Sequence, residues 1–183
     1  YIGGGEESYG FLCEDFVRDK DAVSACAVLA EIAAWAKDQG MSMYQLLQKI
    51  YVEYGFSKEK GISVVKKGKS GAEEIEAMMK HFRENPLKEI AGSKVTYFYD
   101  YSTLKGIDYL ENETLTLDMP VTSNVLQFFT EDGTKVSIRP SGTEPKIKFY
   151  CEVHSKVNSV EELDAADKAA TEKIEAIKAS LGI

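Results

Sequence analysis

The sequence predicts an α+β protein, because amphipathic helical patterns flank a segment that alternates like an antiparallel sheet. Ser70 with Glu73 and Ser159 with Glu162 are spaced as helix capping pairs, and an apolar helical face follows each pair. Between these helices, from Lys94 onward, apolar residues recur at every second position, which is the period of a strand. One helix at each end of such a segment can cover one face of the sheet.

The expected strands follow from the alternation and from the turn residues between them. They are Ile62–Val65, Val95–Tyr101, Thr114–Leu117, Val125–Phe129, Lys135–Arg139 and Lys146–His154. Asp132-Gly133 predicts a hairpin turn between two of these strands. The order is therefore a strand, a helix, several antiparallel strands and a final helix.

Two further helices are expected before this domain. Asp19 or Asp21 is the expected cap of the first helix. Ser42 with Gln45 is a capping pair for the second helix, which is expected to stop at Gly55.

The polar stretch 57–61 is interpreted as a hinge, so the expected boundary separates residues 1–58 from residues 59–183. The first part has too few strands for a sheet of its own, and we expect it to be the end of an incomplete domain. The chain starts at Tyr1 with no preceding Met, which favours a piece of a larger protein.

Composition excludes several classes of protein. The 183 residues are 44% apolar, and no apolar run approaches the roughly 20 residues of a membrane helix. A net charge of −8 argues against nucleic acid as a partner, because phosphate backbones require a basic face. Cys13, Cys26 and Cys151 are odd in number and form no CxxC pair, so we expect a reducing, cytoplasmic location.

The segment from Arg139 to Lys148 has the residue types that bind phosphate. Pro140 and Pro145 bracket a tip in which backbone N–H groups and two hydroxyls can surround an anion. Arg139 adds a planar fork that phosphate accepts bidentately. The tip residues are Ser141, Gly142 and Thr143. The alternative is a rigid hairpin loop with polar surface residues and no ligand.

The glycine-rich segment 3–10 carries acidic and hydroxyl groups instead of phosphate donors. A dinucleotide fingerprint starting at Gly3 would need glycine at position 8, where Ser8 stands. Glu6, Glu7 and Ser8 suit a polyhydroxyl ligand, because carboxylates accept hydrogen bonds from sugar hydroxyls. The alternative is a solvated acidic turn.

Together and in this order, the two loops resemble those of the α-D-phosphohexomutases, the phosphoglucomutase/phosphomannomutase family. Gly5-Glu6-Glu7-Ser8 is similar to the sugar-recognition loop of the family's third domain. Residues 139–145 are similar to the phosphate-binding loop of its fourth domain. The resemblance covers the whole chain but only the C-terminal third or so of a typical member. It implies a C-terminal TATA-binding-protein-like β-α-β-β-β-β-α domain, preceded by the helical end of an α/β/α domain.

The resemblance also implies roles for individual residues. Glu6 and Ser8 would bind the O3 and O4 hydroxyls of a sugar, and Arg139 would hold the phosphate that is not transferred. Ser141, Gly142 and Thr143 would hold that same phosphate. Lys20 matches a family lysine proposed to transfer a proton at the reacting hydroxyl, although an exposed lysine at a helix start is an equal alternative. His81 and His154 match nothing in the family and are interpreted as surface residues.

The family's phosphoserine loop and its Asp-Gly-Asp-x-Asp-Arg magnesium loop are not found in this sequence. By resemblance, Mg²⁺ would be bound by missing N-terminal domains of the same protein. The parent would interconvert hexose 1-phosphate and hexose 6-phosphate through a phosphoserine and a bisphosphate intermediate, and this chain alone would be inactive. The alternatives are a non-catalytic sugar-phosphate-binding or regulatory module and an amino-sugar mutase of the same superfamily.

Overall fold

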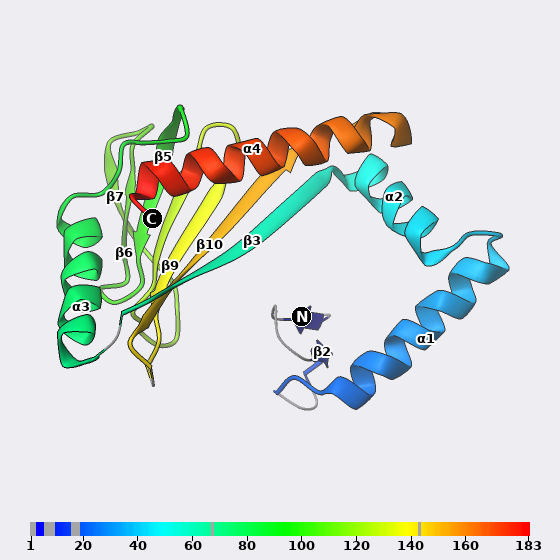
Figure 1. Cartoon of the computed structure of the whole chain (residues 1–183), viewed down its shortest axis with the longest axis horizontal. Coiled ribbons are helices and arrows are strands. Elements are labelled where there is room, and N and C mark those ends of the chain that lie inside the picture. The colour runs from blue at the N-terminus through cyan, green and yellow to red at the C-terminus, as the bar shows by residue number, and fades with distance from the viewer. Residues whose placement is uncertain (1–2, 6–9, 16–18, 67, 143) are drawn as a thin grey trace. The chain divides into compact units, whose positions relative to one another are not determined.

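The computed structural model describes residues 3–5, 10–15, 19–66, 68–142 and 144–183, and it divides into two compact units (Figure 1). The first unit comprises Tyr1–Tyr54 with Asn158–Val160, and the second comprises Gly55–Val157 with Glu161–Ile183. The expected boundary between residues 58 and 59 lies inside a strand of the second unit.

The first unit contains one small hairpin and two helices. Strands β1 (Gly3–Gly5) and β2 (Phe11–Cys13) pair antiparallel, and α1 (Ala22–Asp38) and α2 (Met43–Tyr54) follow. The capping pair expected before α2 is present, because the Ser42 amide donates to Gln45 Oε1 at 2.9 Å and the Gln45 amide donates to Ser42 Oγ at 3.2 Å.

The second unit is an eight-stranded antiparallel sheet with two long helices, which confirms the α+β prediction. Its strand order is β3-β10-β9-β8-β5-β6-β7, and the short β4 pairs with β5. The elements are β3 (Phe56–Val65), α3 (Gly68–Glu84), β4 (Glu89–Ile90), β5 (Ser93–Asp100), β6 (Lys105–Asp108), β7 (Glu113–Thr116), β8 (Leu126–Thr130), β9 (Lys135–Pro140), β10 (Lys146–Ser155), a 3₁₀ turn (Val160–Glu162) and α4 (Leu163–Leu181).

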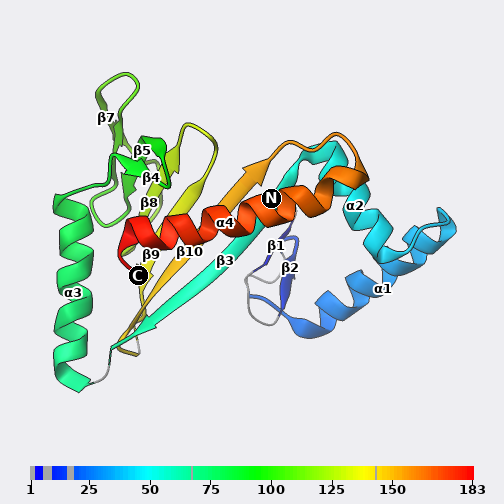
Figure 2. The ribbon, with the colours of Figure 1, turned by 45° about the horizontal axis from the view of Figure 1, so that its top comes forward.

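Alternation along the strands gives this sheet one buried and one open face. On β10 the buried side chains are Ile147, Phe149, Cys151 and Val153, and the residues between them are more exposed. Helix α4 contacts β10, β3 and β4, and α3 contacts β9 and β10 (Figure 2). The ring of Phe82 on α3 lies edge-on to that of Phe149, with 6.2 Å between their centroids. The core of the second unit therefore lies between these helices and one face of the sheet.

Three expectations about the boundaries of elements are wrong. Residues 57–61 belong to β3 and form no hinge, because β3 pairs with β10 along its whole length and this pairing outweighs their polar composition. Helix α3 begins at Gly68, so Ser70 lies inside its first turn instead of capping it. Helix α4 begins at Leu163 after the 3₁₀ turn, and its N-cap residue Glu162 makes no side-chain capping bond.

Four short strands are present that the alternation does not predict. Strands β1, β2, β4 and β6 have two to four residues each. Two or three residues are too few to show alternation, and β6 has a single large apolar residue, Ile107, so tertiary pairing determines that these segments are extended.

The Asp-Gly turn between β8 and β9 is confirmed and is also bonded to α4. Thr130 and Thr134 close the turn, with the Thr130 amide 3.0 Å from the Thr134 carbonyl oxygen. Asp132 accepts from Thr130 Oγ1 at 2.8 Å and forms an ion pair with Lys173 of α4. Partial burial acts to raise the pKa of the Asp132 carboxyl, but the hydrogen bonds from Lys173, Thr130 and Thr134 hold that pKa well below its ordinary value.

The first testable prediction concerns the core. Phe149→Ala removes a side chain that is fully buried, and we expect the free energy of unfolding to fall by about 3–5 kcal/mol. Urea unfolding followed by circular dichroism measures this loss. Leu110→Ala is the matched control, because the Leu110 side chain is 63% exposed and its removal should change the free energy by less than about 0.5 kcal/mol. Equal losses in the two variants would contradict the assignment of the core.

The second prediction concerns acid stability. Because the folded pKa of Asp132 is lowered, its charge stabilises the fold above the unfolded-state value near 4 and loses this effect as pH falls further. Asp132→Asn should therefore destabilise the protein at neutral pH and reduce the acid sensitivity of its melting temperature. Melting curves between about pH 2 and pH 7 test this. Parallel pH profiles for the wild type and the variant would show that this carboxylate is unimportant.

Candidate functional site

The loop that joins β9 and β10 is held at both ends by backbone hydrogen bonds. The Ser141 amide donates to the Lys146 carbonyl at 2.8 Å, and the Lys146 amide donates to the Glu144 carbonyl at 2.7 Å. From the neighbouring segment, the Lys66 amide donates to the Pro145 carbonyl at 2.9 Å. The loop therefore leaves the sheet at a defined position beside the start of α3.

Arg139 and Lys148 lie directly opposite each other where the two strands enter this loop. They are partners in the register of β9 and β10, so their Cβ atoms are about 4.5–5.5 Å apart on the same face of the sheet. Both alternate with buried residues, Ile138 on one strand and Ile147 and Phe149 on the other, so both lie on the open face. Two cations on neighbouring strands can bind one anion together by charge-assisted hydrogen bonds.

Lys146 has a different arrangement. Its Nζ lies 2.5 Å from Glu144 Oε2, so the loop compensates this positive charge internally. The hydrogen bond and the charge of Lys146, and to a smaller extent the charge of Lys148, lower the pKa of the Glu144 carboxyl. Because Arg139 and Lys148 face each other on the open side of the sheet, they are better placed than Lys146 to attract a phosphate.

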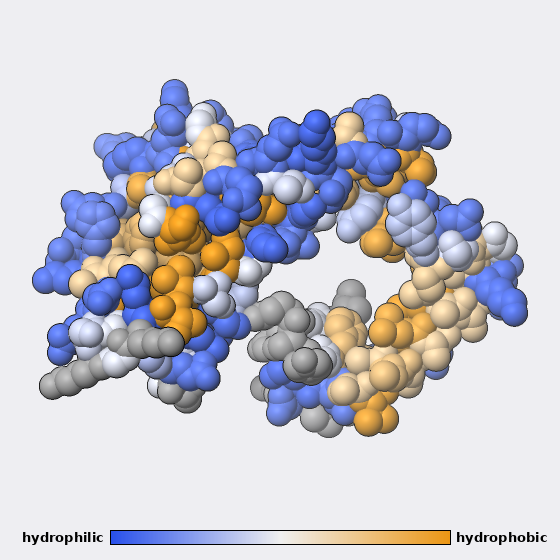
Figure 3. All heavy atoms as spheres, in the orientation of Figure 1, coloured by the Kyte–Doolittle hydropathy of each residue, from blue (hydrophilic) through white to orange (hydrophobic). Residues whose placement is uncertain are grey.

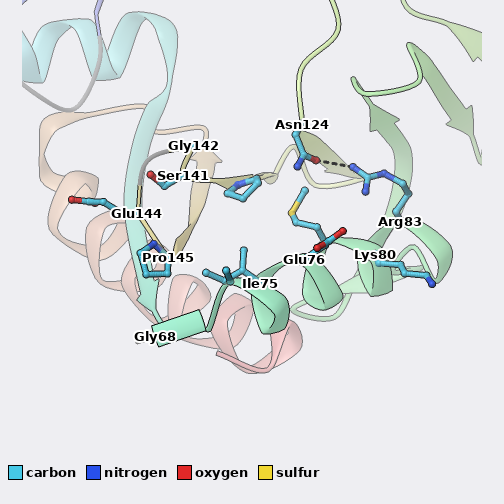
Figure 4. Close-up of a pocket in the computed structure, with 13 residues that line it drawn as sticks. Gly68, Ile75, Glu76, Lys80, Arg83, Asn124, Ser141, Gly142, Glu144 and Pro145 are labelled. Atoms are coloured by element: carbon cyan, nitrogen blue, oxygen red, sulfur yellow. Dashed lines mark hydrogen bonds between the residues drawn. The ribbon is translucent and has the colours of Figure 1, made fainter. Parts of the chain in front are cut away.

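A cavity of about 810 Å³ lies on the other side of the loop, against α3 (Figure 4). The loop contributes Ser141, Gly142 and three neighbouring residues, and α3 contributes both apolar and charged side chains. Arg83 lies along the wall of the cavity. Its Nη2 donates to Asn124 Oδ1 and its Nε donates to Asp100 Oδ2, each at 2.9 Å. The lining residues are Gly68, Ala72, Ile75, Glu76, Met79, Lys80, Arg83, Asn124, Pro140, Ser141, Gly142, Glu144 and Pro145.

This cavity is a poorer phosphate site than the open face. Arg83 is already engaged with the buried carboxylate of Asp100, and Glu76 and Glu144 bring negative charge to the lining. Arg139 is not among the residues that line it. Of the residues expected to hold phosphate, the structure places Ser141 and Gly142 at the cavity and Arg139 beside Lys148 on the opposite side of the hairpin.

In the first unit, Lys20 lies next to the end of the glycine-rich segment. Phe11 and Asp21 form an isolated antiparallel bridge, in which the Asp21 amide donates to the Phe11 carbonyl at 3.2 Å. Gly10 has a φ of +122°, and a Cβ at this position would lie 3.2 Å from the Asp21 backbone and 3.3 Å from that of Lys20. Only glycine combines this backbone conformation with so close an approach. Gly10 therefore brings the end of the segment 3–10 against Lys20.

Lys20 immediately precedes the N-cap of α1. Asp21 caps the helix by accepting from the amides of Ser24 at 2.7 Å and Val23 at 3.2 Å. These backbone hydrogen bonds lower the pKa of the Asp21 carboxyl. The Lys20 side chain is 38% exposed, and its Nζ lies 3.9 Å from Asp19 Oδ1. The helix start thus fixes the backbone of Lys20 and leaves its ammonium group partly accessible to solvent.

Three of the expected site residues, Glu6, Ser8 and Thr143, lie outside the residues that the structure describes. The described site residues are divided between the units, with Lys20 in the first and Arg139, Ser141 and Gly142 in the second. His81 and His154 are exposed, as expected.

Lys148 is a candidate that the motif alone does not single out. A signal is nevertheless present, because Lys146-Ile147-Lys148 alternates charged and apolar residues and the loop length fixes the register of the two strands. That register places Lys148, not Lys146, opposite Arg139.

Three further properties of the described residues concern metal binding, membrane spans and thiols. Within 3–5, 10–15, 19–66, 68–142 and 144–183, no group of three or more His, Cys, Asp and Glu side chains is arranged to hold a metal ion. In the same ranges, no helix has the length and apolar character that crossing a membrane requires. The three cysteines are free thiols, and burial raises the pKa of Cys151 to about 11.

Comparison with known proteins matches both units. Residues 1–54 match the model of phosphoglucomutase/phosphomannomutase, alpha/beta/alpha domain III. Residues 63–169 match the model of the phosphoglucomutase/phosphomannomutase C-terminal domain.

Curated relatives include phosphoglucomutases of two staphylococci. The one from Staphylococcus haemolyticus (strain JCSC1435) is 39% identical over 145 residues, which are 79% of this chain and 26% of the relative. The one from Staphylococcus aureus (strain MRSA252) is 41% identical over the same length and the same shares. The chain therefore spans about a quarter of the length of these relatives.

A solved structure shares the fold. It is the open form of parafusin, a phosphoglucomutase from Paramecium, which superposes with a TM-score of 0.50 at 19% identity over 95% of this chain and 30% of that one. The model matches, the relatives and this shared fold agree with the resemblance seen in the two loops. The chain belongs to the phosphoglucomutase/phosphomannomutase family, of which it carries sequence matching the third and the C-terminal domains.

Proposed function

We propose that this chain is the substrate-binding part of an enzyme that interconverts hexose 1-phosphate and hexose 6-phosphate. The observation that carries the proposal is the pair of cations, Arg139 and Lys148, facing each other on the open side of the β9–β10 hairpin. The first unit is assigned to the sugar-binding third domain and the second unit to the phosphate-binding fourth domain, with the boundary between Tyr54 and Gly55. A cytoplasmic location is part of the proposal, supported by the free thiols.

In this proposal, the hairpin grips the phosphate that is not being transferred. Arg139 offers two N–H groups to two phosphate oxygens, and Lys148 adds a point charge from the neighbouring strand. Ser141, Gly142 and Thr143 would add donors from the tip of the loop, where Ser141 and Gly142 also line the cavity on the side of α3. A grip of this kind fixes one end of the sugar phosphate, and positioning supplies much of the catalysis in phosphoryl transfer.

The segment 3–10 would bind the sugar through its hydroxyl groups. Glu6 and Ser8 would bind the O3 and O4 hydroxyls, which lie near the axis about which a hexose bisphosphate turns over between its two phosphoryl transfers. Lys20, held beside this segment by the close approach at Gly10, would move a proton at the reacting hydroxyl. Glucose and mannose differ at C2. A loop that contacts only O3 and O4 makes no contact at C2, so we expect weak discrimination between the two sugars.

The phosphoserine and the Mg²⁺ that activates phosphoryl transfer would come from other parts of the parent enzyme. The described residues do not fit a metal, because no cluster of carboxylates or histidines converges among them. The isolated chain is therefore proposed to be inactive.

Apolar side chains on α1 and α2 support the proposal that the first unit packs against more of the parent protein (Figure 3). In these two helices, all of whose residues the structure describes, only Ala36 and Leu46 are buried. The exposed apolar residues include Val23, Leu29, Ile32, Trp35, Tyr44, Leu47, Ile50 and Tyr54. An apolar surface of this extent is characteristic of an interface.

The third prediction tests the phosphate grip in the parent enzyme. Arg139→Ala should raise KM for glucose 1-phosphate by about tenfold to a hundredfold, because it removes charged hydrogen bonds to phosphate. Arg139→Lys should recover only part of this loss, since a point charge cannot bind bidentately. The matched control, Lys156→Ala, removes one positive charge from an exposed residue outside the hairpin. An unchanged KM for Arg139→Ala would exclude Arg139 from the site.

The fourth prediction concerns Lys20. In the parent enzyme, Lys20→Ala should lower kcat about a hundredfold and change KM much less, because proton transfer matters in the transition state. Lys37→Ala, which removes a lysine near the far end of α1, is the control. Wild-type kcat in the Lys20 variant would leave this lysine as an exposed surface residue. Mutase activity from the 183-residue chain alone would refute the proposed inactivity.

A further inference from the structure

The open face of the second unit carries a cluster of aromatic rings, which we call the aromatic platform and define as Tyr97, Tyr99, Tyr101 and Phe129. The Tyr99 ring is at its centre, with centroid distances of 5.1 Å to Phe129, 6.2 Å to Tyr97 and 6.4 Å to Tyr101. All four side chains are half-buried. They lie on the face opposite to the buried Phe98 and Phe128, which point toward the helices.

Strand register and one glycine hold the platform in place. Tyr97 is the partner of Phe129, and Tyr99 is the partner of Gln127 on one side and Gly106 on the other. A Cβ at position 106 would lie only 2.7 Å from Cδ1 of Tyr99. The Tyr99 ring therefore occupies the space above Gly106, which no other residue would leave open.

A row of polar side chains connects the platform to the cationic pair. The Tyr101 hydroxyl donates to Gln127 Oε1 at 2.8 Å, and Gln127 Nε2 donates to Ser137 Oγ at 2.9 Å. Ser137 lies two residues before Arg139 on β9, on the same open face. The Gln127 amide keeps one further N–H and one further lone pair for a ligand.

The dimensions of this surface restrict what it can bind. Neighbouring strands are about 4.8 Å apart, and Arg139 lies two residues beyond Ser137, which is in line with Tyr99 through Gln127. The backbone of Arg139 is therefore roughly 12 Å from that of Tyr99 at the centre of the platform. Burial raises the pKa of Tyr99 and Tyr101, and both phenols stay neutral at physiological pH. The surface thus has a cationic end for one phosphate, a polar middle and an aromatic end whose rings are neutral and which Asp108, the strand partner of Tyr97, borders.

We infer that this face binds a nucleoside phosphate, with its phosphate between Arg139 and Lys148 and its base against the aromatic platform. The inference rests on the proposed phosphate grip and adds a second class of ligand, which would compete with hexose phosphates for the same cations. A base is preferred to a second sugar because every nucleobase has a flat π-face that stacks on aromatic side chains. The net charge of −8 disfavours a longer nucleic acid.

The test compares ligands that differ only in the base. Calorimetric titration of the 183-residue chain should show adenosine 5′-monophosphate binding about tenfold more tightly than ribose 5-phosphate, the gain expected from stacking one base. In a chain with ¹³C-labelled tyrosine, the ring signals of Tyr97, Tyr99 and Tyr101 should shift with the nucleotide and not with ribose 5-phosphate.

Two variants separate the aromatic contribution from the phosphate contribution. Tyr99→Leu removes the central ring, and Gly106→Ala displaces that ring while keeping all four aromatic residues. Each should reduce the affinity for the nucleotide to that for ribose 5-phosphate, whose own affinity should not change. Tyr44→Leu, at an exposed tyrosine on α2, should change neither affinity. Circular dichroism establishes that each variant is folded.

The outcomes distinguish this inference from the proposed function. Equal affinities for the nucleotide and for ribose 5-phosphate, with no shift of the tyrosine signals, would overturn the nucleoside-phosphate site and leave the phosphate grip intact. Failure of both ligands to bind at millimolar concentration would overturn both. Loss of binding of both ligands in Arg139→Ala, together with the tenfold preference in the wild type, would support both.

Discussion

The antiparallel register of β9 and β10 is the constraint on which the rest of the second unit depends. Ile147, Phe149, Cys151 and Val153 must face the helices, so Lys148 and Tyr150 must face the other way. A shift of one residue would move the apolar residues to solvent and Lys148 into the core. Hydrophobic burial thus determines where the charge lies: the core places Lys148 opposite Arg139 on the open face.

Patterns that repeat over several residues can be predicted from the sequence, and contacts between distant segments cannot. The alternation of β9 and β10, the Asp-Gly turn at Asp132 and the Ser42–Gln45 pair each involve neighbours in the sequence, and each is present in the structure. The composition of residues 57–61 indicates a hinge, which is wrong because their partner, the distal half of β10, lies about a hundred residues away. Strands β4 and β6 are missed for a different reason: their partners are close in the sequence, but the strands themselves are too short and too poor in apolar residues to show alternation.

The residues of the candidate site also fall into those that a local motif suggests and those that only the fold brings together. Arg139 and the loop 139–145 can be identified because a compact motif contains them, and Lys20 can be identified by resemblance alone. Lys148 and the aromatic platform become evident only when four strands are placed side by side. Gly106 is an extreme case, since the reason for a glycine there is the ring of Tyr99 on the adjacent strand. The roles of all these site residues stay predictions, and Glu6, Ser8 and Thr143 also lie outside the described residues.

The strand order also separates two regions that evolution can change independently. The β6–β7 hairpin forms one edge of the sheet, and two strands, β5 and β8, lie between it and the hairpin that holds Arg139. Insertions and substitutions are tolerated most readily at such edges and loop tips. Changes there would reshape the surface around Tyr99 without altering how β9 and β10 pair. Members of the family can therefore diversify the surface around Tyr99 while the β9–β10 hairpin, the proposed phosphate site, stays the same.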